Sequence, residues 1–494
     1  MRSIAIVILV VCGGISAGAA VNTRKLVDAV RERNDAEVQT LVAQRADPNT
    51  AQGDGATAIH WAAHWDDLKT AELLIHAGAN VNATDDEGVT PLSLACINAN
   101  PAMVALFLKA GANPNKAQVN GETPLMISAL TGSAEIVNQL LSRGADANAR
   151  ELSRGQTALM RAVARNHPEA ASALIAGGAD VKARSGNRFT ALLFAAQQGS
   201  VEAARILLKA GADVNDTAPD GVGGDTNARV MFKPNTEAGA LLVAIDSSHP
   251  EMAKFLIDNG ANVNDHGAGR TALHAAVQQA MPDVVTLLLD HGADPNARLE
   301  KPLPLLSRFI HQDSGMEVDS IGATPFWLAA SYTDLRMMRI LAGRGADTRI
   351  VSRDKTTPLM VAAGVDFVDG QDKYGRRWFQ DSMPLQLAAL EALKLCMTLG
   401  NDINDANANG QTALHGATYF GSTLLVQFLY ENGAKLDAQN KFGQTPYVIT
   451  QGLYLAGSFT IRKDAGDLLL KLGADPLPGG DHPLLRVNGK DAAK

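Results

Sequence analysis

A four-residue phrase returns along this chain at nearly constant spacing. It consists of Thr, then Pro or Ala, then a large apolar residue and one further residue, and its first copies lie 33 or 34 residues apart. Ten copies follow this pattern and a weaker one opens at Gly239; the ten open at Thr57, Thr90, Thr123, Thr157, Thr190, Thr271, Thr324, Thr357, Thr412 and Thr445. A fixed period of this length predicts a stack of similar units, each burying its apolar face only against its neighbours.

Each copy of the phrase predicts the start of a helix. A Thr hydroxyl can accept from the free amides of the first helical turn, and Pro is tolerated at the first helical position. A short apolar segment such as 91–96 follows, then a polar break and a second, amphipathic helix such as 71–75. That second helix runs into a second recurring phrase, for example Gly78-Ala-Asn-Val-Asn82. Gly in the left-handed conformation commonly ends a helix, and the Asn, Asp and Pro after it predict a tight turn.

The two phrases keep a fixed register, and together they resemble the ankyrin repeat family, whose pattern is T-P-L-H-x-A-A followed by G-A-D-V-N. The resemblance covers residues 22–476. It implies an all-α solenoid of about eleven helix-turn-helix repeats, with a concave face built by hairpin loops and first helices. Residues 22–49 read as an N-terminal half-repeat that lacks the usual Gly, and residues 477–494 as a C-terminal tail.

The N-terminus predicts a signal peptide over residues 1–20. Arg2 is followed by an apolar run over residues 4–11 and then by the small residues Ala17 to Ala20. We expect cleavage near Ala19 or Ala20, which leaves the array at 21–476 exported to the periplasm or secreted. A lipid anchor at Cys12 and an uncleaved anchor are the less favoured alternatives, since Val11 precedes Cys12 where a lipoprotein signal has a small residue. The Ala- and Gly-rich composition favours a bacterial origin.

Composition and motifs argue against several classes of function. The net charge of −8 disfavours general nucleic-acid binding. His60 and His64 have an i, i+4 spacing that could hold a metal, but His60 is the family histidine, repeated as His274 and His415, and a structural role is favoured. No catalytic motif is found in the mature chain, so we expect no enzyme, no cofactor and no metal. Cys96 replaces a family Ala on a first helix and is interpreted as a buried apolar residue.

Three insertions interrupt the regular spacing of the repeats. Residues 216–236 and 298–321 follow turn phrases and should lengthen loops between repeats, and a short helix is expected at 305–311. Residues 366–381 should lie between the two helices of one repeat, which lengthens its second helix over 385–399. About seven further residues lie between the last two helices, around Ser458. A sub-division of the array near 298–321 stays open.

The candidate protein-binding residues are aromatic or charged side chains placed by the family geometry. They close first helices (His64, Trp65, Tyr332 and Tyr419), occupy loop tips (Phe189 and Phe442) or lie in the third insertion (Tyr374, Arg376, Arg377 and Trp378). Aromatic residues and Arg dominate many interfaces. For the helix aromatics, packing against a neighbouring repeat is an equally good interpretation, and for Trp378 anchoring of the long loop is preferred. Gln197, Gln198, Gln278 and Gln279 belong to the same helix ends.

These observations predict an exported scaffold that binds a partner protein through its concave face and inserted loops. The first alternative is a secreted effector acting on host proteins. The second is an enzyme whose site lies in the insertions, which nothing in the residues favours.

Overall fold

The structure is a computed structural model that describes residues 26–218, 237–301, 318–365, 383–451 and 461–476. Within these ranges the chain is all-α, and its only β pairing is an isolated bridge between Thr217 and Gly239. Contacts divide the chain into two units, residues 1–213 and 214–494. This division falls beside the first insertion.

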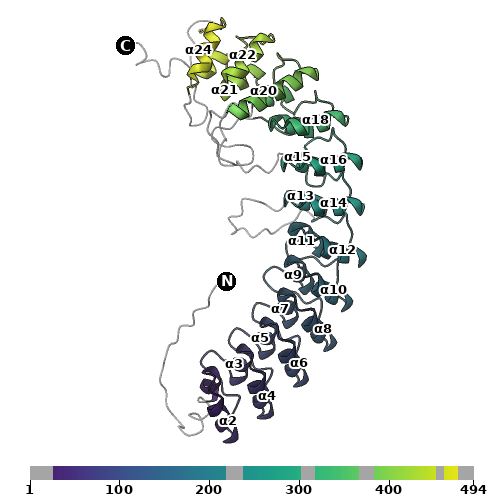
Figure 1. Ribbon diagram of the computed structural model, residues 1–494, viewed down its shortest axis with the longest axis vertical. Coiled ribbons are helices and arrows are strands. Elements are labelled where there is room, and N and C mark those ends of the chain that lie inside the picture. Colours follow the sequence, from purple (N-terminus) through teal and green to yellow (C-terminus); the bar gives the residue numbers. More distant parts are fainter. Residues whose placement is uncertain (1–25, 219–236, 302–317, 366–382, 452–460, 477–494) are drawn as a thin grey trace, which may run out of the picture. The chain divides into compact units, whose positions relative to one another are not determined.

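The first unit consists of stacked helix pairs. A helix at 26–31 precedes α2 (Asp35–Ala43), so the N-terminal segment supplies both helices of a pair and more than the half-repeat expected. Five further pairs follow: α3 (Ala58–His64) and α4 (Leu68–His76), α5 (Pro91–Ile97) and α6 (Pro101–Lys109), α7 (Pro124–Thr131) and α8 (Ala134–Ser142), α9 (Ala158–Ala164) and α10 (Pro168–Ala176), α11 (Ala191–Gln198) and α12 (Val201–Lys209). Each first helix packs on the next first helix and each second helix on the next second helix, as Figure 1 shows for α3 to α12.

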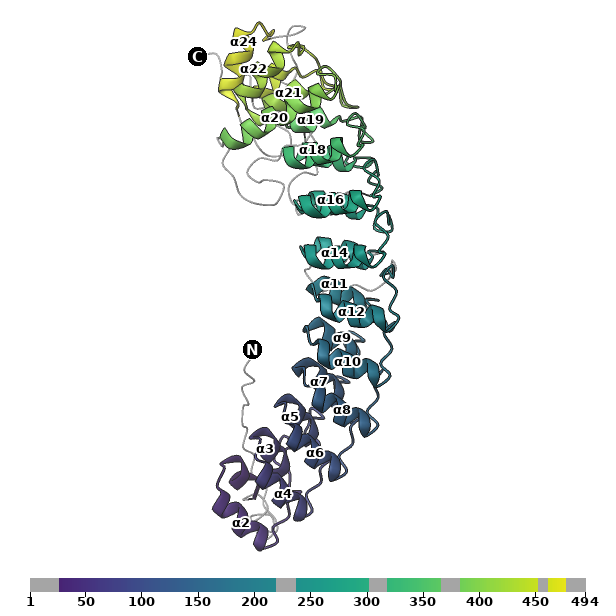
Figure 2. The ribbon, with the colours of Figure 1, turned by 45° about the vertical axis from the view of Figure 1, so that its right-hand side comes forward.

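The second unit repeats this arrangement with six pairs. They are α13 (Ala240–Asp246) and α14 (Pro250–Asp258), α15 (Ala272–Gln278) and α16 (Pro282–Asp290), α17 (Pro325–Ser331) and α18 (Leu335–Gly343), α19 (Pro358–Ala362) and α20 (Met383–Thr398), α21 (Ala413–Phe420) and α22 (Thr423–Glu431), α23 (Pro446–Thr450) and α24 (Lys463–Lys471). In Figure 2, α14, α16 and α18 lie one above another. Because α15 packs on α17 and α16 on α18, the stack continues across the second insertion. The described helices thus include the eleven pairs predicted from the phrase.

The repeated phrase starts helices by the expected chemistry. The Thr90 hydroxyl accepts from the Ser93 amide at 3.0 Å, and Thr324 accepts from Trp327 at 3.2 Å. Pro91 lies in the first turn of α5, where the absent amide costs no hydrogen bond. After the second helix, Gly78 has a φ of 93°, which is the left-handed conformation predicted for the turn phrase. In the N-terminal pair Arg45, with a φ of 59°, adopts this conformation without being Gly.

A second left-handed position separates the two helices in the repeats where the structure describes this break. It lies nine residues after the first residue of the opening phrase, and its φ is between 50° and 80° in nine repeats. Only three of these residues are Gly; the nine are Asp66, Ala99, Gly132, Asn166, Gly199, Ser248, Ala280, Thr333 and Gly421. The interhelical break is therefore a fixed backbone feature that the stack imposes on ordinary side chains.

The Asn that closes the turn phrase joins consecutive repeats. The Asn82 side-chain amide donates to the Gly111 carbonyl at 3.0 Å, and its oxygen accepts from the Asn113 amide at 2.7 Å. The same pair of bonds is made by Asn49, Asn115, Asn148, Asn215, Asn264, Asn296 and Asn404. Turn chemistry explains why Asn is favoured here, but these bonds give it a second function as a link between repeats.

The insertions lie where the sequence predicted. The ends of the first are joined by the Ala218 amide and the Ala238 carbonyl at 3.2 Å, and those of the second by Leu299 and Ala323 at 2.9 Å. The third falls between α19 and α20, and α20 has 16 residues where the other second helices have nine. The expected helix at 305–311 and the extra residues around Ser458 lie outside the described residues.

Candidate functional site

The three family histidines are part of the scaffold. Nδ1 of His415 accepts from the Thr412 amide at 3.1 Å, so the ring proton lies on Nε2, which donates to the Gln444 carbonyl at 3.1 Å. His60 makes the same contacts with Thr57 and Val89, and His274 with Thr271 and Ala323. Each ring therefore closes its own helix start and reaches the next repeat. No group of three potential metal ligands is found among the described residues.

Burial keeps these rings neutral. It lowers the pKa of His274 to about 3 and that of His415 to about 4, because an imidazolium would lose its hydration inside the stack. Burial also lowers the pKa of His60. The same desolvation raises the pKa of the Cys96 and Cys396 thiols to about 12, and both cysteines are buried and unpaired. Cys96 is thus a buried apolar residue, as predicted.

Trp65 is both packed and exposed. Its indole Nε1 donates to the Arg31 carbonyl at 3.1 Å, and the ring stacks on Trp61 with centroids 6.3 Å apart. The guanidinium carbon of Arg33 lies 5.9 Å from the ring centroid, and the His64 ring meets it edge-on at 4.7 Å. Even so, 40% of Trp65 is exposed. Both interpretations of this residue therefore hold, since the ring is fixed in place and a large part of its apolar surface remains accessible.

Ile97 extends this exposed surface by one repeat. It occupies the position of His64 in the next repeat and is 51% exposed. The Asn98 side-chain amide donates to the carbonyl of Ala63 at 2.9 Å and of His64 at 3.1 Å, which ties the two helix ends together. We name His64, Trp65 and Ile97 the helix-end surface. The repeat register could have identified Ile97, because it places an aliphatic residue at the exposed position that His64 occupies one repeat earlier.

The remaining helix-end candidates are less accessible. Tyr332 caps α17, and Tyr419 lies in the last turn of α21; both are half-buried. The backbone oxygen of Tyr419 accepts from Arg462 Nε at 3.0 Å. Gln197 and Gln198 are exposed. Gln278 is half-buried and accepts from Arg270, whose guanidinium also binds Asp246 at 2.6 Å.

The expectation for one of the loop candidates is wrong. Phe189 was expected at an exposed loop tip, but it is 7% exposed and packs edge-on against Phe194 with ring centroids 5.6 Å apart. The loop turns this ring inward onto the first helix, so Phe189 has no surface to offer a partner. Phe442 is 44% exposed, with Lys441 Nζ 5.1 Å from its ring centroid. Tyr374, Arg376, Arg377 and Trp378 lie outside the described residues.

The loop tips expose two aliphatic residues that the sequence reasoning missed. Val119 is 66% exposed and Leu152 is 77% exposed. Backbone bonds place successive tips side by side: the Val119 amide donates to the Glu87 carbonyl and the Leu152 amide to the Asn120 carbonyl, both at 3.0 Å. Their positions, four and five residues before the next opening Thr, would have marked them as tips.

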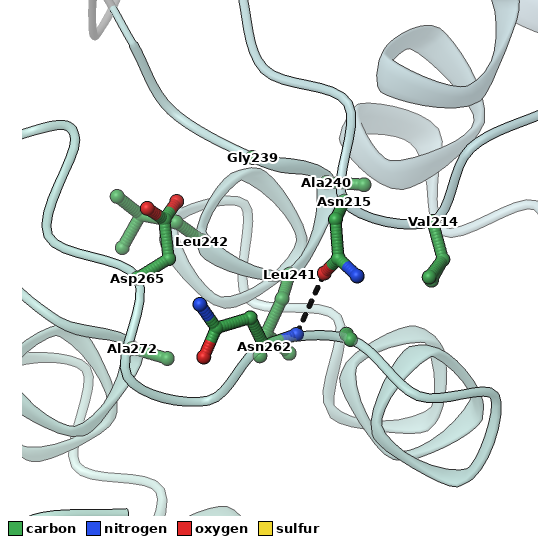
Figure 3. Close-up of a pocket in the computed structure, with 10 residues that line it drawn as sticks. Val214, Asn215, Gly239, Ala240, Leu241, Leu242, Asn262, Asp265 and Ala272 are labelled. Atoms are coloured by element: carbon green, nitrogen blue, oxygen red, sulfur yellow. Dashed lines mark hydrogen bonds between the residues drawn. The ribbon is translucent and has the colours of Figure 1, made fainter.

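A cavity of about 200 Å³ lies in the second unit beside the start of α13 (Figure 3). Its polar lining belongs to the scaffold. Asn215 bonds the Asn262 amide at 2.7 Å as an inter-repeat link, and Asp265 accepts from the Gly267 amide at 3.2 Å. Leu241 and Leu242 supply apolar lining. These bonds of Asn215 and Asp265 therefore lie within the stack.

Sequence models of ankyrin repeats match most of this stack. The three-copy model matches residues 26–118, 67–151, 125–218 and 225–298, and the single-repeat model matches 409–441, together more than half of the chain. The chain belongs to the ankyrin repeat family. Helices α17 to α20, between the matched ranges, carry the same stacking.

Curated relatives match a shorter part. Neurogenic locus notch homolog protein 1 from Mus musculus and from Homo sapiens is 32% identical over 166 residues, which is 31% of this chain and 7% or 6% of those proteins. The chain thus spans only a small fraction of the relatives it matches. Ankyrin repeats typically mediate protein–protein interaction, and proteins built of them are generally scaffolds and not enzymes. Over the described ranges, no helix has both the length and the apolarity needed to cross a membrane.

Proposed function

We propose that this ankyrin-repeat protein is an exported scaffold that binds a partner protein through its first-helix ends and loop tips. The observation that carries the proposal is the helix-end surface, where Trp65 is fixed by the Arg31 carbonyl and by Trp61 yet is 40% exposed. A rigid, exposed indole beside an aliphatic residue binds a partner with little loss of side-chain entropy.

The other residues that stand out in the sequence have structural roles, and this supports the same proposal. The histidines, the inter-repeat asparagines and the lining of the cavity are engaged in hydrogen bonds within the stack. Ile97, Val119 and Leu152 are exposed, and Trp65 keeps 40% of its surface accessible although its indole donates to the Arg31 carbonyl. Exposed apolar groups gathered on one face are typical of a surface that a partner covers.

The proposal is tested by recovery of a partner with the purified full chain from the native compartment. We expect Ile97→Ser to weaken recovery at least about tenfold, because Ile97 is half exposed and its removal leaves no cavity. Trp65→Ala should weaken it further, and Trp65→Phe, which keeps an aromatic ring, should weaken it less. Tyr332→Ala is expected to have a smaller effect.

The matched control is Tyr430→Ser. Tyr430 is 38% exposed but lies on α22, a second helix. Recovery should be unchanged by this substitution. If Tyr430→Ser weakened recovery as much as Ile97→Ser, or if no partner were recovered under several conditions, the proposed binding face would be rejected.

Export is a separate part of the proposal and rests on the features of residues 1–20. Fractionation of the native cell should place a chain shortened by about twenty residues in the periplasm or the medium. Recovery of that chain inside a host cell would favour the secreted effector instead. A full-length chain in the cytoplasm would contradict export.

A further inference from the structure

The loop tips of the first unit change charge along the stack. The early tips carry Asp54, Asp86 and Glu87, all of them exposed. The later tips carry Arg150 and Arg154 in one repeat and Arg184 and Arg188 at the equivalent positions of the next. We name Arg150, Arg154 and Arg188 the arginine surface. Exposed Arg165, at the end of α9, adds a further cation to the same repeats.

The backbone holds these tips in one row. The Asp86 amide donates to the Asp54 carbonyl at 2.9 Å, and the Gly186 amide donates to the Arg154 carbonyl at 2.6 Å. Together with the bonds at Val119 and Leu152, they form a continuous series from residue 54 to residue 186. The charge change therefore runs along a single ordered edge.

One of these guanidinium groups is positioned by a carbonyl. Arg150 donates to the carbonyl of Arg184 in the next repeat. This bond neutralises no charge, because the acceptor is an uncharged oxygen. For Arg154 and Arg188 the described residues provide no carboxylate in ion-pair contact. The arginine surface thus keeps its positive charge in a fixed geometry.

Nearby carboxylates are used elsewhere. Glu151 is 5% exposed, and its side chain accepts from the amides of Ser153 at 2.6 Å, Arg154 at 2.7 Å and Gln156 at 3.0 Å. Glu122 forms an ion pair with Arg161, in which both side chains are largely buried. Glu151 therefore makes the tip rigid, and neither carboxylate forms an ion pair with the arginine surface.

Leu152 supplies an apolar contact at the edge of this charge. Its side chain is 77% exposed and lies against the preceding loop, since a Cβ built on Gly121 would be 2.8 Å from Leu152 Cγ. Most of this aliphatic side chain therefore stays accessible between Arg150 and Arg154 in the sequence. It is suited to contact an apolar side chain of a ligand that also carries negative charge.

We propose that the arginine surface and Leu152 bind an acidic protein segment that carries a large apolar side chain. The inference rests on the proposed protein-binding function and specifies the chemistry of the partner. Arginines recognise carboxylates through paired hydrogen bonds, and the apolar contact at Leu152 distinguishes a polypeptide from a nucleic acid backbone. Asp54, Asp86 and Glu87 repel the same segment, which fixes its place over the later repeats.

The test is a selection of peptides from a random displayed library on the full chain. The peptides enriched should contain Asp or Glu together with Leu, Ile, Phe or Met. A synthetic peptide of the enriched sequence should bind at least about tenfold more weakly to the double variant Arg154→Glu and Arg188→Glu, and more weakly at high salt. Leu152→Ser should also weaken it.

The matched control is the double variant Lys69→Glu and Lys109→Glu, which makes the same change in net charge at exposed positions of α4 and α6. It should bind the peptide as the native chain does. Equal weakening by this control, enrichment of neutral or basic peptides, or displacement of the peptide by single-stranded polyuridylate at equal concentration would overturn the inference.

The same selection separates this inference from the broader function. Peptides whose binding is lost with Ile97→Ser but kept with Arg154→Glu and Arg188→Glu would overturn the inference and leave the proposed function standing. A selection without any enrichment would overturn the inference, and partner recovery would then decide the proposed function by itself.

Discussion

The indole Nε1 of Trp327 lies 2.9 Å from the backbone oxygen of Thr356 in the next repeat. This oxygen immediately precedes the next opening phrase. It corresponds to the Gln444 oxygen that His415 reaches through Nε2. Trp327 occupies the histidine position of its own phrase, so the indole replaces the imidazole as donor. The fourth residue of the phrase therefore links consecutive repeats through either of two ring N–H groups.

Trp327→Phe removes this donor and leaves the Thr356 oxygen with only the Ser352 amide and hydroxyl as donors. Because Trp327 is 1% exposed, water cannot replace the lost bond, and we expect a local destabilisation of about 1 kcal/mol. Native-state hydrogen exchange should show faster exchange for amides of α17 and α19. Trp65→Phe is the matched control, since it removes an indole bond at a site where water has access. Equal effects of the two substitutions would contradict this interpretation.

Acid should destabilise the stack through its buried histidines. In the unfolded chain these groups titrate near a pKa of about 6.5, whereas in the folded protein the pKa of His415 is about 4 and that of His274 about 3. The unfolded state therefore binds protons first as the pH falls. Stability is complete above about pH 6.5 and decreases as the pH falls toward these folded values, by on the order of 1.4 kcal/mol per pH unit for each histidine.

His415→Met tests this pH dependence with a residue that the chain itself uses at this position of the phrase, in Met126, Met160 and Met360. The variant should lose stability at neutral pH, because the Gln444 oxygen keeps only the Asn440 amide as donor and the Thr412 amide loses its acceptor on Nδ1. Its melting temperature should fall less than that of the native chain between about pH 6.5 and 5, where carboxylates contribute little. Parallel pH profiles for the two proteins would contradict the assignment.

The inter-repeat asparagines should contribute to stability beyond their turns. Asn82→Ala removes the bonds to Gly111 and Asn113, and we expect a loss of about 1–2 kcal/mol, limited by solvent access to the site. Urea unfolding of the full chain measures this loss. Lys116→Ala, at a nearby exposed position, should change stability by less than about 0.5 kcal/mol. If Asn82→Ala left the stability of the chain unchanged, the role of Asn82 would be limited to the turn.

The left-handed position between the two helices of a repeat can be tested by opposite substitutions at two equivalent sites. Ala99 has a φ of 54°, so Ala99→Gly should stabilise the chain by about 1 kcal/mol. Gly132 has a φ of 80°, and a Cβ there would lie 2.5 Å from His167 Nδ1, so Gly132→Ala should destabilise by more than that. Thermal unfolding measures both, and a destabilising Ala99→Gly would contradict the argument.

The sequence could predict the helix starts, the turn glycines and the place of each insertion because these depend on local chemistry repeated many times. Thr90 and Gly78 are examples, and a structural role for His60 followed from its recurrence at His274 and His415. The left-handed Ala99 could not be predicted, since Ala has no preference for that conformation and only the neighbouring helices impose it.

Side-chain exposure at the surface was harder to predict, because it depends on how each loop folds over the next repeat. Phe189 and Phe442 lie in comparable loops, yet the first is 7% and the second 44% exposed. Leu152 was missed because apolar residues in loops are not by themselves informative. The three backbone amides that donate to the Glu151 carboxylate likewise depend on the folded loop.

Hydrogen exchange of the full chain, measured with and without its recovered partner, tests the central claim most directly. The claim predicts slower exchange at the ends of α3 and α5, around Trp65 and Ile97, and at the loop tips around Val119 and Leu152. The second helices α4 and α6 should be unchanged. Protection confined to the second helices, with none at these helix ends and tips, would contradict the account.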